Sequence, residues 1–316
     1  MKIHILDAKT LGEDIDLSAI TSLGETVIYQ STLPDERVQN IGDAEVVVLN
    51  KVILDSEVLS AAKKLKLICV AATGYDNVDV EYCSKHGIAL CNVVGYSSAS
   101  VAQLTVSVVL SLMLHMKEYT AFVESGEYTK SGIQNRLSPT FHELDGLTWG
   151  IAGYGNIGKR VAAAAKALGC RVIAYKKTPE EGVECMSLEE LCRQSDILTI
   201  HLPLTPETRG IFGEKEIALM KKSAVVVNMA RGAVTDEQAF AEALADGRIG
   251  GFGTDVYSAE PIGADSPFWK ILSHPNALFT PHMAWGAYEA RIRCMSEIGE
   301  NIKAFYRGEI RNRVDL

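Results

Sequence analysis

The stretch 147-LTWGIAGYGNIGKRVAAAAKALGCRVIAYK-176 indicates the fold of the larger part of the chain. It begins with a short apolar run, passes through a glycine-rich turn into an alanine-rich helical segment, and ends on a second apolar run. The turn, Gly153-Tyr154-Gly155-Asn156-Ile157-Gly158, matches the pattern G-x-G-x-x-G. This order of strand, turn, helix and strand is the context that a dinucleotide-binding fingerprint requires. A tight turn without a ligand is the alternative.

Each glycine of the turn has a physical reason. Gly153 permits the tight turn, Gly155 lets the backbone approach a pyrophosphate, and Gly158 lets the helix pack closely against the strand. The N-terminus of the helix offers unpaired N–H groups and a partial positive charge to the phosphates.

The end of the second strand departs from the usual pattern. An acid commonly stands about 20 residues beyond the fingerprint and binds the adenine ribose hydroxyls. Here Lys176 and Lys177 occupy that place, and the next acids, Glu180 and Glu181, follow Pro179. Because lysines attract a 2′-phosphate, we expect NADP(H) to be accepted and preferred. The alternative is a solvated lysine pair beside an NAD site.

The fingerprint belongs to a series of strands that alternates with helical patterns, which is typical of a doubly wound parallel sheet. About six strands are expected, at 147–155, 170–176, 196–202, 223–230, 250–257 and 277–282. An earlier series predicts a second, smaller parallel sheet, with strands at 2–7, 26–30, 44–50, 65–72 and 88–93.

Two further helices, 100–119 and 289–308, lie outside these series. They favour a chain that crosses from the first domain to the second and later returns. We therefore expect a discontinuous first domain, 1–98 and 287–316, and a dinucleotide-binding domain, 99–286. The polar segment 120–146 suits a loop, an arm or an oligomer contact.

Composition excludes several functions. The 316 residues suit about two domains, and 31 basic against 40 acidic residues disfavour nucleic acid as a partner. The seven cysteines are scattered without a C-x-x-C pair, which favours buried thiols in a reducing compartment and no metal site. Residues 87–116 lack charges, but polar side chains interrupt them, which favours a buried helix over a membrane span. We expect a cytoplasmic protein without a membrane partner.

Three ionisable residues follow strands of the second series: Arg231, Glu260 and His282. Ligands of open α/β sheets bind at the carboxyl ends of the strands, where these residues would lie. Reduction of a 2-oxo acid needs a cation for the carboxylate and carbonyl, which Arg231 offers as a planar fork. It also needs a proton, which His282 would donate while Glu260 keeps the imidazole protonated.

Each of these residues has a simpler interpretation. Arg231 could form an ion pair with Asp236, Glu260 could be an exposed loop acid, and His282 could be an ordinary loop histidine. Their joint position at three strand ends beside one nucleotide turn favours function. His201 would neighbour the nucleotide and would not be the acid.

At these residues the sequence resembles the D-isomer-specific 2-hydroxyacid dehydrogenase family, over essentially the whole chain. The motifs that carry the resemblance are ATGYDNVD (72–79), GIAGYGNIGKRVA (150–162), HLPLTPETRGIF (201–212), VVVNMARGAVTDEQA (225–239), GTDVYSAEP (253–261) and TPHMAWGAYEAR (280–291).

The resemblance implies a Rossmann-type cofactor domain inserted in a discontinuous, flavodoxin-like substrate domain, with a cleft between them. It implies Arg231, Glu260 and His282 as the catalytic set. Substrate contacts would come from Arg231, Trp285 and the backbone N–H groups of Ala72, Thr73 and Gly74. Asp255 would help to hold the nicotinamide carboxamide, and His282 is also expected to contact the cofactor. The remaining expected cofactor contacts are His201, Leu202, Pro203, Thr208, Met229 and Ala230. A homodimer through the cofactor domain would give segment 120–146 a role.

The ending PHMAWGAYEAR is similar to the glycerate dehydrogenase and hydroxypyruvate reductase branch, which favours hydroxypyruvate and glyoxylate as substrates. Trp285 would wall a small pocket, or else pack as an ordinary core indole. The family's V-A-E reads Val101-Ala102-Gln103 here, with no role assigned to the lost charge. Two other functions stay open: a non-catalytic, dinucleotide-sensing corepressor-like module, and oxidation of another small anion such as formate or phosphite.

Overall fold

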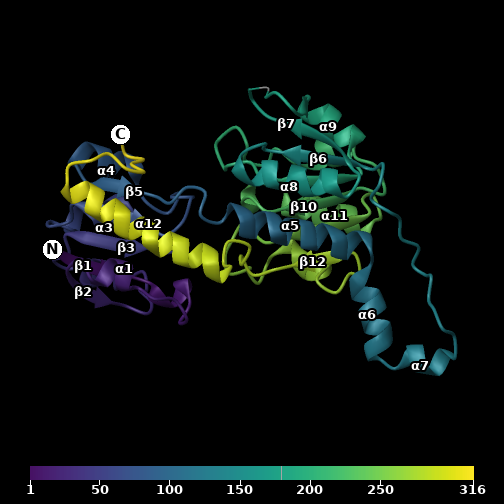
Figure 1. The fold of residues 1–316 in the computed structure, drawn as a ribbon, viewed down its shortest axis with the longest axis horizontal. Helices are drawn as coiled ribbons and strands as arrows, with labels where there is room; N and C mark the ends of the chain where they lie inside the picture. Colours follow the sequence, from purple (N-terminus) through teal and green to yellow (C-terminus); the bar gives the residue numbers. More distant parts are fainter. Residues whose placement is uncertain (179) are drawn as a thin grey trace. The chain divides into compact units, whose positions relative to one another are not determined.

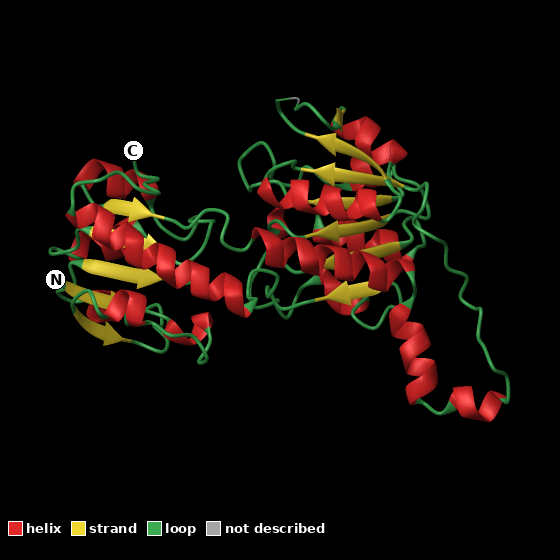
Figure 2. Cartoon of the chain, viewed as in Figure 1, coloured by secondary structure: helices red, strands yellow, loops and turns green. Residues whose placement is uncertain are grey.

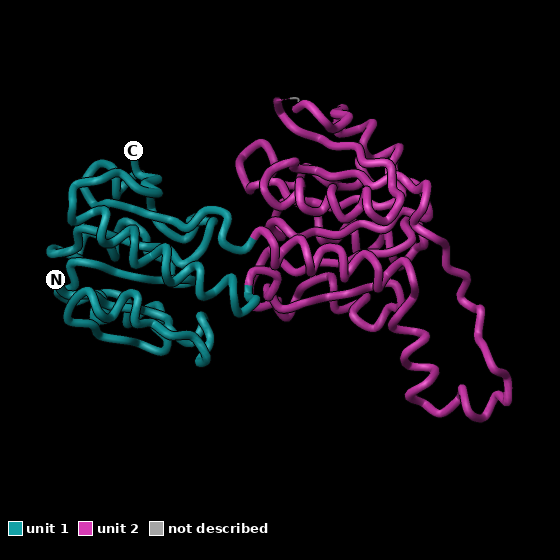
Figure 3. The backbone as a smooth tube through the Cα atoms, in the orientation of Figure 1, with its two compact units in different colours: residues 1–97, 286–316 teal, residues 98–285 magenta. Residues whose placement is uncertain are grey.

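The computed structural model describes residues 1–178 and 180–316, which form two compact units (Figure 3). Unit 1 comprises Met1–Ser97 and Gly286–Leu316, and unit 2 comprises Ser98–Trp285. The chain therefore leaves unit 1 once and returns to it near the C-terminus.

Unit 1 is built on a parallel sheet in the order β2-β1-β3-β4-β5. The two strands β3 and β4 are buried along their whole length, as expected for strands covered on both faces. Its strands are β1 (Lys2–Ile5), β2 (Glu25–Ile28), β3 (Val46–Leu49), β4 (Leu67–Val70) and β5 (Ala89–Cys91). Its helices are α1 (Ser18–Thr21), α2 (Arg37–Ile41), α3 (Ser56–Ala61), α4 (Val80–His86) and α12 (Tyr288–Tyr306), with a 3-10 turn at Ala8–Leu11.

Unit 2 contains a second parallel sheet, in the order β12-β11-β10-β9-β6-β7-β8, with helices on its faces (Figure 2). Its strands are β6 (Thr148–Ala152), β7 (Arg171–Tyr175), β8 (Glu184–Cys185), β9 (Ile197–Ile200), β10 (Val225–Asn228), β11 (Gly251–Thr254) and β12 (Ala277–Phe279). Its helices are α5 (Ser98–Met113), α6 (Met116–Glu124), α7 (Glu127–Ser131), α8 (Asn156–Ala167), α9 (Leu188–Gln194), α10 (Glu214–Ile217) and α11 (Glu237–Ala245), with 3-10 turns at Gly232–Val234 and Pro267–Lys270.

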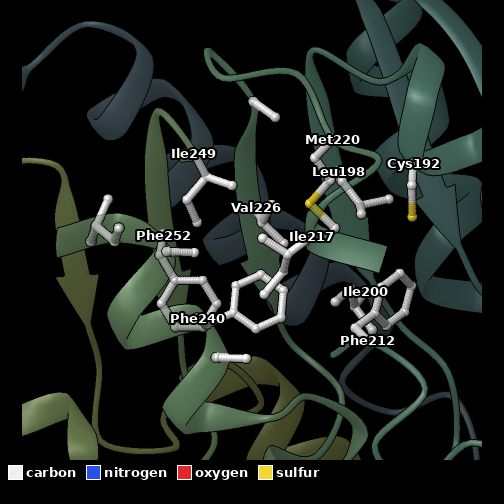
Figure 4. Close-up of a cluster of buried hydrophobic side chains, with 14 of the residues drawn as sticks. Cys192, Leu198, Ile200, Phe212, Ile217, Met220, Val226, Phe240, Ile249 and Phe252 are labelled. Atoms are coloured by element: carbon white, nitrogen blue, oxygen red, sulfur yellow. The ribbon is translucent and has the colours of Figure 1, made fainter. Parts of the chain in front are cut away.

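Two apolar clusters hold the sheet of unit 2 in place. One contains Phe240 of α11, whose ring stacks on Phe252 of β11 with 4.9 Å between the ring centroids (Figure 4). The other gathers α5 and α8 around Trp149 of β6, whose indole N–H donates to the hydroxyl of Thr199 over 3.1 Å. The expected α/β fold with two parallel sheets is confirmed.

Several helices begin where the sequence offers a capping side chain. The carboxylates of Asp55, Asp79 and Asp236 accept the N–H three residues ahead at the starts of α3, α4 and α11. Ser187 does the same for α9. These caps satisfy N–H groups that a helix leaves unpaired in its first turn.

The structure corrects three details. The expected helix 100–119 is broken at His115, whose φ is +50°, so that α5 and α6 are bent by 67°. Segment 120–146 is not wholly irregular, since α6 continues into it and α7 lies within it; the two helices project from the sheet of unit 2 (Figure 1). The short edge strand β8 adds to the six strands expected.

Among the described residues, no single helix is long and apolar enough to cross a membrane, although the bent pair α5 and α6 meets that test when taken together.

Candidate active site

The glycine-rich turn connects β6 to α8 in the way that the fingerprint predicts. Gly153 has φ +98° and donates its N–H to the carbonyl of Tyr175 over 3.0 Å, which fixes the turn beside the end of β7. A Cβ at Gly153 would lie 2.7 Å from the backbone of His201. At Gly158 a Cβ would lie 2.3 Å from the carbonyl oxygen of Gly153, so only glycine lets the helix start this close to the turn.

The surroundings of this turn fit a dinucleotide. No side chain caps the N-terminus of α8 at Gly155, and a Cβ there would meet nothing within 4 Å. A pyrophosphate could therefore approach the N–H groups of the first turn. Behind the turn, the two ring nitrogens of His201 are buried without a hydrogen bond to any described residue.

Burial lowers the pKa of His201 to about 3, so its imidazole is neutral at pH 7. The other expected cofactor contacts nearby lie at the ends of β9 and β10. Leu202, Met229 and Ala230 are buried, and the hydroxyl of Thr208 donates to the carbonyl of Pro203 over 2.6 Å. Their contacts with a cofactor stay a prediction.

The buried neutral state of His201 has a consequence for stability. The folded-state pKa lies below the ordinary value of 6.5, so the unfolded chain takes up a proton first as the pH falls. The stability associated with neutral His201 is present above pH 6.5 and is lost as the pH falls towards 3. Between pH 7.5 and 5, the wild type should lose up to about 2 kcal/mol more unfolding free energy than His201→Gln. Denaturant titration without cofactor measures this. An equal loss in both proteins would contradict it, and exposed His142→Gln serves as the control.

Arg231 is carried by a turn that a buried amide holds in place. Asn228, at the end of β10, donates its amide N–H to the carbonyl of Arg231 over 3.0 Å and accepts the N–H of Ala230 over 3.0 Å. Gly232 brings this turn against the neighbouring loop, because a Cβ there would lie 2.0 Å from the backbone carbon of Tyr257. The sequence thus places Arg231 on a rigid turn beside the loop that carries Glu260.

Asp255 organises the loop that carries His282. Its buried carboxylate accepts the hydroxyl of Thr280 over 2.6 Å and the N–H groups of Met283 and Ala284 over 2.9 and 2.8 Å. These bonds fasten the segment after β12 to the end of β11. His282 has φ +51° within this loop, an uncommon conformation that its neighbours enforce.

The side chains of His282 and Glu260 lie within hydrogen-bond distance of each other. The imidazole Nδ1 of His282 lies 2.6 Å from Oε2 of Glu260, and the other carboxylate oxygen accepts the N–H of Tyr257 over 3.1 Å. The hydroxyl of Tyr257 donates to the carbonyl of Thr280 over 2.8 Å, and burial raises its pKa to about 12. The contact of Nδ1 with Glu260 fixes the orientation of the ring.

Trp285 and the Ala72–Gly74 loop are fixed by hydrogen bonds within their own units. The indole N–H of Trp285 donates to the carbonyl of His282 over 2.9 Å, and the ring packs against the cluster of α5 and α8. In unit 1, Thr73 donates its hydroxyl to Val93 over 2.8 Å and accepts the side-chain amide of Asn92 over 2.7 Å at its carbonyl. Within the described ranges, no group of three or more His, Cys, Asp or Glu side chains is arranged to hold a metal.

The profile of the family described as "D-isomer specific 2-hydroxyacid dehydrogenase, NAD binding domain" matches residues 106–284. The chain belongs to the D-isomer specific 2-hydroxyacid dehydrogenase family and is an NAD(P)-dependent oxidoreductase acting on 2-oxo and 2-hydroxy acids.

Among similar proteins, hydroxypyruvate reductase of Blautia hydrogenotrophica is 36% identical, with 100% of both chains covered. Glycerate dehydrogenase of Methylorubrum extorquens is 36% identical, with 99% of both chains covered. The crystal structure of D-lactate dehydrogenase from Aquifex aeolicus, complexed with NAD and lactic acid, superposes with a TM-score of 0.88 at 29% identity, covering 100% of this chain and 99% of that one.

Sequence reasoning missed the residues that position the candidate acid and arginine. Asn228 and Thr280 look like ordinary polar residues at strand ends, and Gly232 looks like a simple turn residue. The signal available was their place: each stands within three residues of Arg231 or His282, at or shortly after the end of a strand.

Proposed function

We propose that this enzyme reduces a small 2-oxo acid, with hydroxypyruvate and glyoxylate favoured, to the D-2-hydroxy acid. The observation that carries the proposal is the His282–Glu260 pair at 2.6 Å on the loop that Asp255 fastens to the neighbouring strand. The names of the two 36% identical relatives, hydroxypyruvate reductase and glycerate dehydrogenase, support this substrate class.

The proposed roles follow from the chemistry of each group. Arg231 binds the substrate carboxylate and polarises the carbonyl oxygen. When bound, the reduced nicotinamide supplies the hydride that the carbonyl carbon gains. His282 gives the proton that the carbonyl oxygen gains, and Glu260 stabilises the imidazolium before transfer. Backbone N–H groups at Ala72–Gly74 and the indole of Trp285 are proposed as further substrate contacts.

For the cofactor, we propose that NADPH is accepted and favoured over NADH. Lys176 follows β7 at the position where an acid would repel a 2′-phosphate. Unit 2 then acts as the dinucleotide-binding domain, with contacts from the turn Gly153–Gly158, and unit 1 acts as the substrate domain. The cytoplasm is the proposed location, because all seven cysteines are free thiols and six of them are buried.

The test is a panel of initial rates with NADH and NADPH against hydroxypyruvate, glyoxylate, pyruvate and bulkier 2-oxo acids. We expect the highest kcat/KM on hydroxypyruvate or glyoxylate with NADPH. Tight dinucleotide binding without turnover on any oxo acid would contradict the proposal and favour the binding-module alternative. Oxidation of formate or phosphite would favour the third function.

We also propose that two copies of the chain associate through the arm formed by α6, α7 and the segment that follows. Several large apolar side chains are exposed there: Val123, Ile133, Leu137 and Phe141, of which Leu137 is 74% exposed. A patch of this kind in a folded protein marks an interaction surface. Light scattering should give twice the 34.3 kDa of one chain. Ile133→Glu with Leu137→Glu should shift the mass to one chain, and an unchanged dimer in that variant would contradict the contact.

A further inference from the structure

One carboxylate bridges two lysines beside the glycine-rich turn. The side chain of Glu180 forms ion pairs with Lys159, in the first turn of α8, and with Lys176, directly after β7. Both elements lie next to each other in unit 2 (Figure 1). The side chains of Glu180 and Lys176 are 27% and 34% exposed, so this group is partly withdrawn from solvent.

The pairing changes the charge expected from the sequence. Lys176 and Lys177 alone suggest a strongly positive site, and the structure adds Lys159 to it. The same structure sets Glu180 between Lys159 and Lys176. Hydrogen bonds from these two lysines lower the pKa of Glu180, so its carboxylate is ionised at neutral pH. The pKa of Glu207 is lowered chiefly by a hydrogen bond from Thr205, and the charge of Lys177 contributes to the same shift.

We propose that Glu180 is a specificity-determining residue that opposes recognition of a 2′-phosphate by Lys159 and Lys176. This inference rests on the proposed binding of NADPH at the same site. A 2′-phosphate carries close to two negative charges and needs the same ammonium groups that Glu180 occupies. To bind them, it must displace the carboxylate or share the lysines with it at short range, and like charges repel.

A ribose hydroxyl, unlike a 2′-phosphate, is favoured by a carboxylate at this site. It can donate a hydrogen bond to a carboxylate, which is the usual reason for an acid near the end of this strand. Glu180 therefore takes the role of the acid that the sequence lacks at position 176. It lies four residues later in the chain and is held by two lysines. The preference between the two cofactors becomes a balance between the lysines and this one carboxylate.

The competing explanation is that Glu180 only ties its loop to α8. Binding of cofactor fragments separates the two, because a tether would not distinguish ligands that differ by one phosphate. The fragments are ADP-ribose and 2′-phospho-ADP-ribose, titrated calorimetrically into the wild type, Glu180→Gln and Lys176→Gln. Glu189→Gln is the matched control, since Glu189 also pairs with two cations, Lys215 and Arg193, on the same unit.

In Glu180→Gln, selectivity for the phosphorylated fragment should rise about tenfold, equivalent to about 1.4 kcal/mol. It should fall in Lys176→Gln and stay at the wild-type value in Glu189→Gln. The gain should shrink in high salt because charge interactions near the surface are screened. A ratio in Glu180→Gln equal to that of the control would overturn the inference while leaving the dinucleotide site intact. Failure of the wild type to bind either fragment would overturn the proposed site itself. Glu180→Ala, which removes the same charge, should repeat the result.

Discussion

Replacing His282 by Asn is expected to lower kcat by about two to four orders of magnitude, the contribution of a positioned proton donor. The change removes the ring that Glu260 holds at 2.6 Å and leaves a neutral side chain of similar width. The dissociation constant of the dinucleotide should stay close to the wild-type value, because the glycine-rich turn is untouched. Steady-state rates and fluorescence titration measure the two quantities.

Replacing Glu260 by Gln tests the partner of His282. Without the carboxylate, the ring of His282 loses the partner that holds it at 2.6 Å, so kcat should fall while the dissociation constant of the dinucleotide stays close to the wild-type value. Steady-state rates and fluorescence titration again measure the two quantities. His86→Asn, on the exposed end of α4, serves as the control and should leave kcat unchanged.

If His282→Asn kept more than about a tenth of kcat, far above the range for a lost acid, His282 would not be the proton donor.

Replacing Arg231 by Gln is expected to lower kcat/KM by about two to three orders of magnitude, the cost of removing one preorganised donor to a developing oxyanion. KM should rise and kcat should fall, because the guanidinium is proposed to bind the substrate carboxylate and to polarise the carbonyl. Arg231→Lys keeps the charge but loses the planar fork, so it should recover only part of the activity.

The arginine prediction has a control in the same unit. Arg248 pairs with Glu214 near the ends of two surface helices, so Arg248→Gln should leave kcat/KM unchanged. Unchanged kcat/KM in Arg231→Gln on every accepted oxo acid would remove this residue from the mechanism. A loss confined to KM would limit its role to substrate binding.

Much of the fold could be predicted from local pattern. The buried strands, the glycine turn and the capped helices all depend on residues close together in the sequence. The break at His115 could not, because it depends on a contact far along the chain. The His115 ring bonds the side chain of Asn276 over 2.9 Å. The edge strand β8 is two residues long and partly polar, so it carries no periodic signal.

In the candidate site, too, some features could be predicted from the sequence and others could not. The position of His282 and Glu260 at neighbouring strand ends could be predicted, and the structure brings the two side chains together. The bonds that Asp255 makes to the His282 loop could not, since three partners converge on one carboxylate only after the strands are paired. The pairing of Glu180 with Lys159 and Lys176 likewise depends on how the loop after β7 returns to α8. Counting lysines along the strand could not reveal it.

The chirality of the product formed from hydroxypyruvate and the reduced dinucleotide tests the proposed reduction by His282 and the cofactor. Chiral chromatography, run alongside cofactor absorbance, measures the product and the cofactor consumed together. D-glycerate should form as the single enantiomer, in equal amount to the cofactor oxidised, and its rate of formation should fall by about two to four orders of magnitude in His282→Asn. L-glycerate, a racemic product, or cofactor oxidation by His282→Asn at more than about a tenth of the wild-type rate would show that the proposed reduction is wrong.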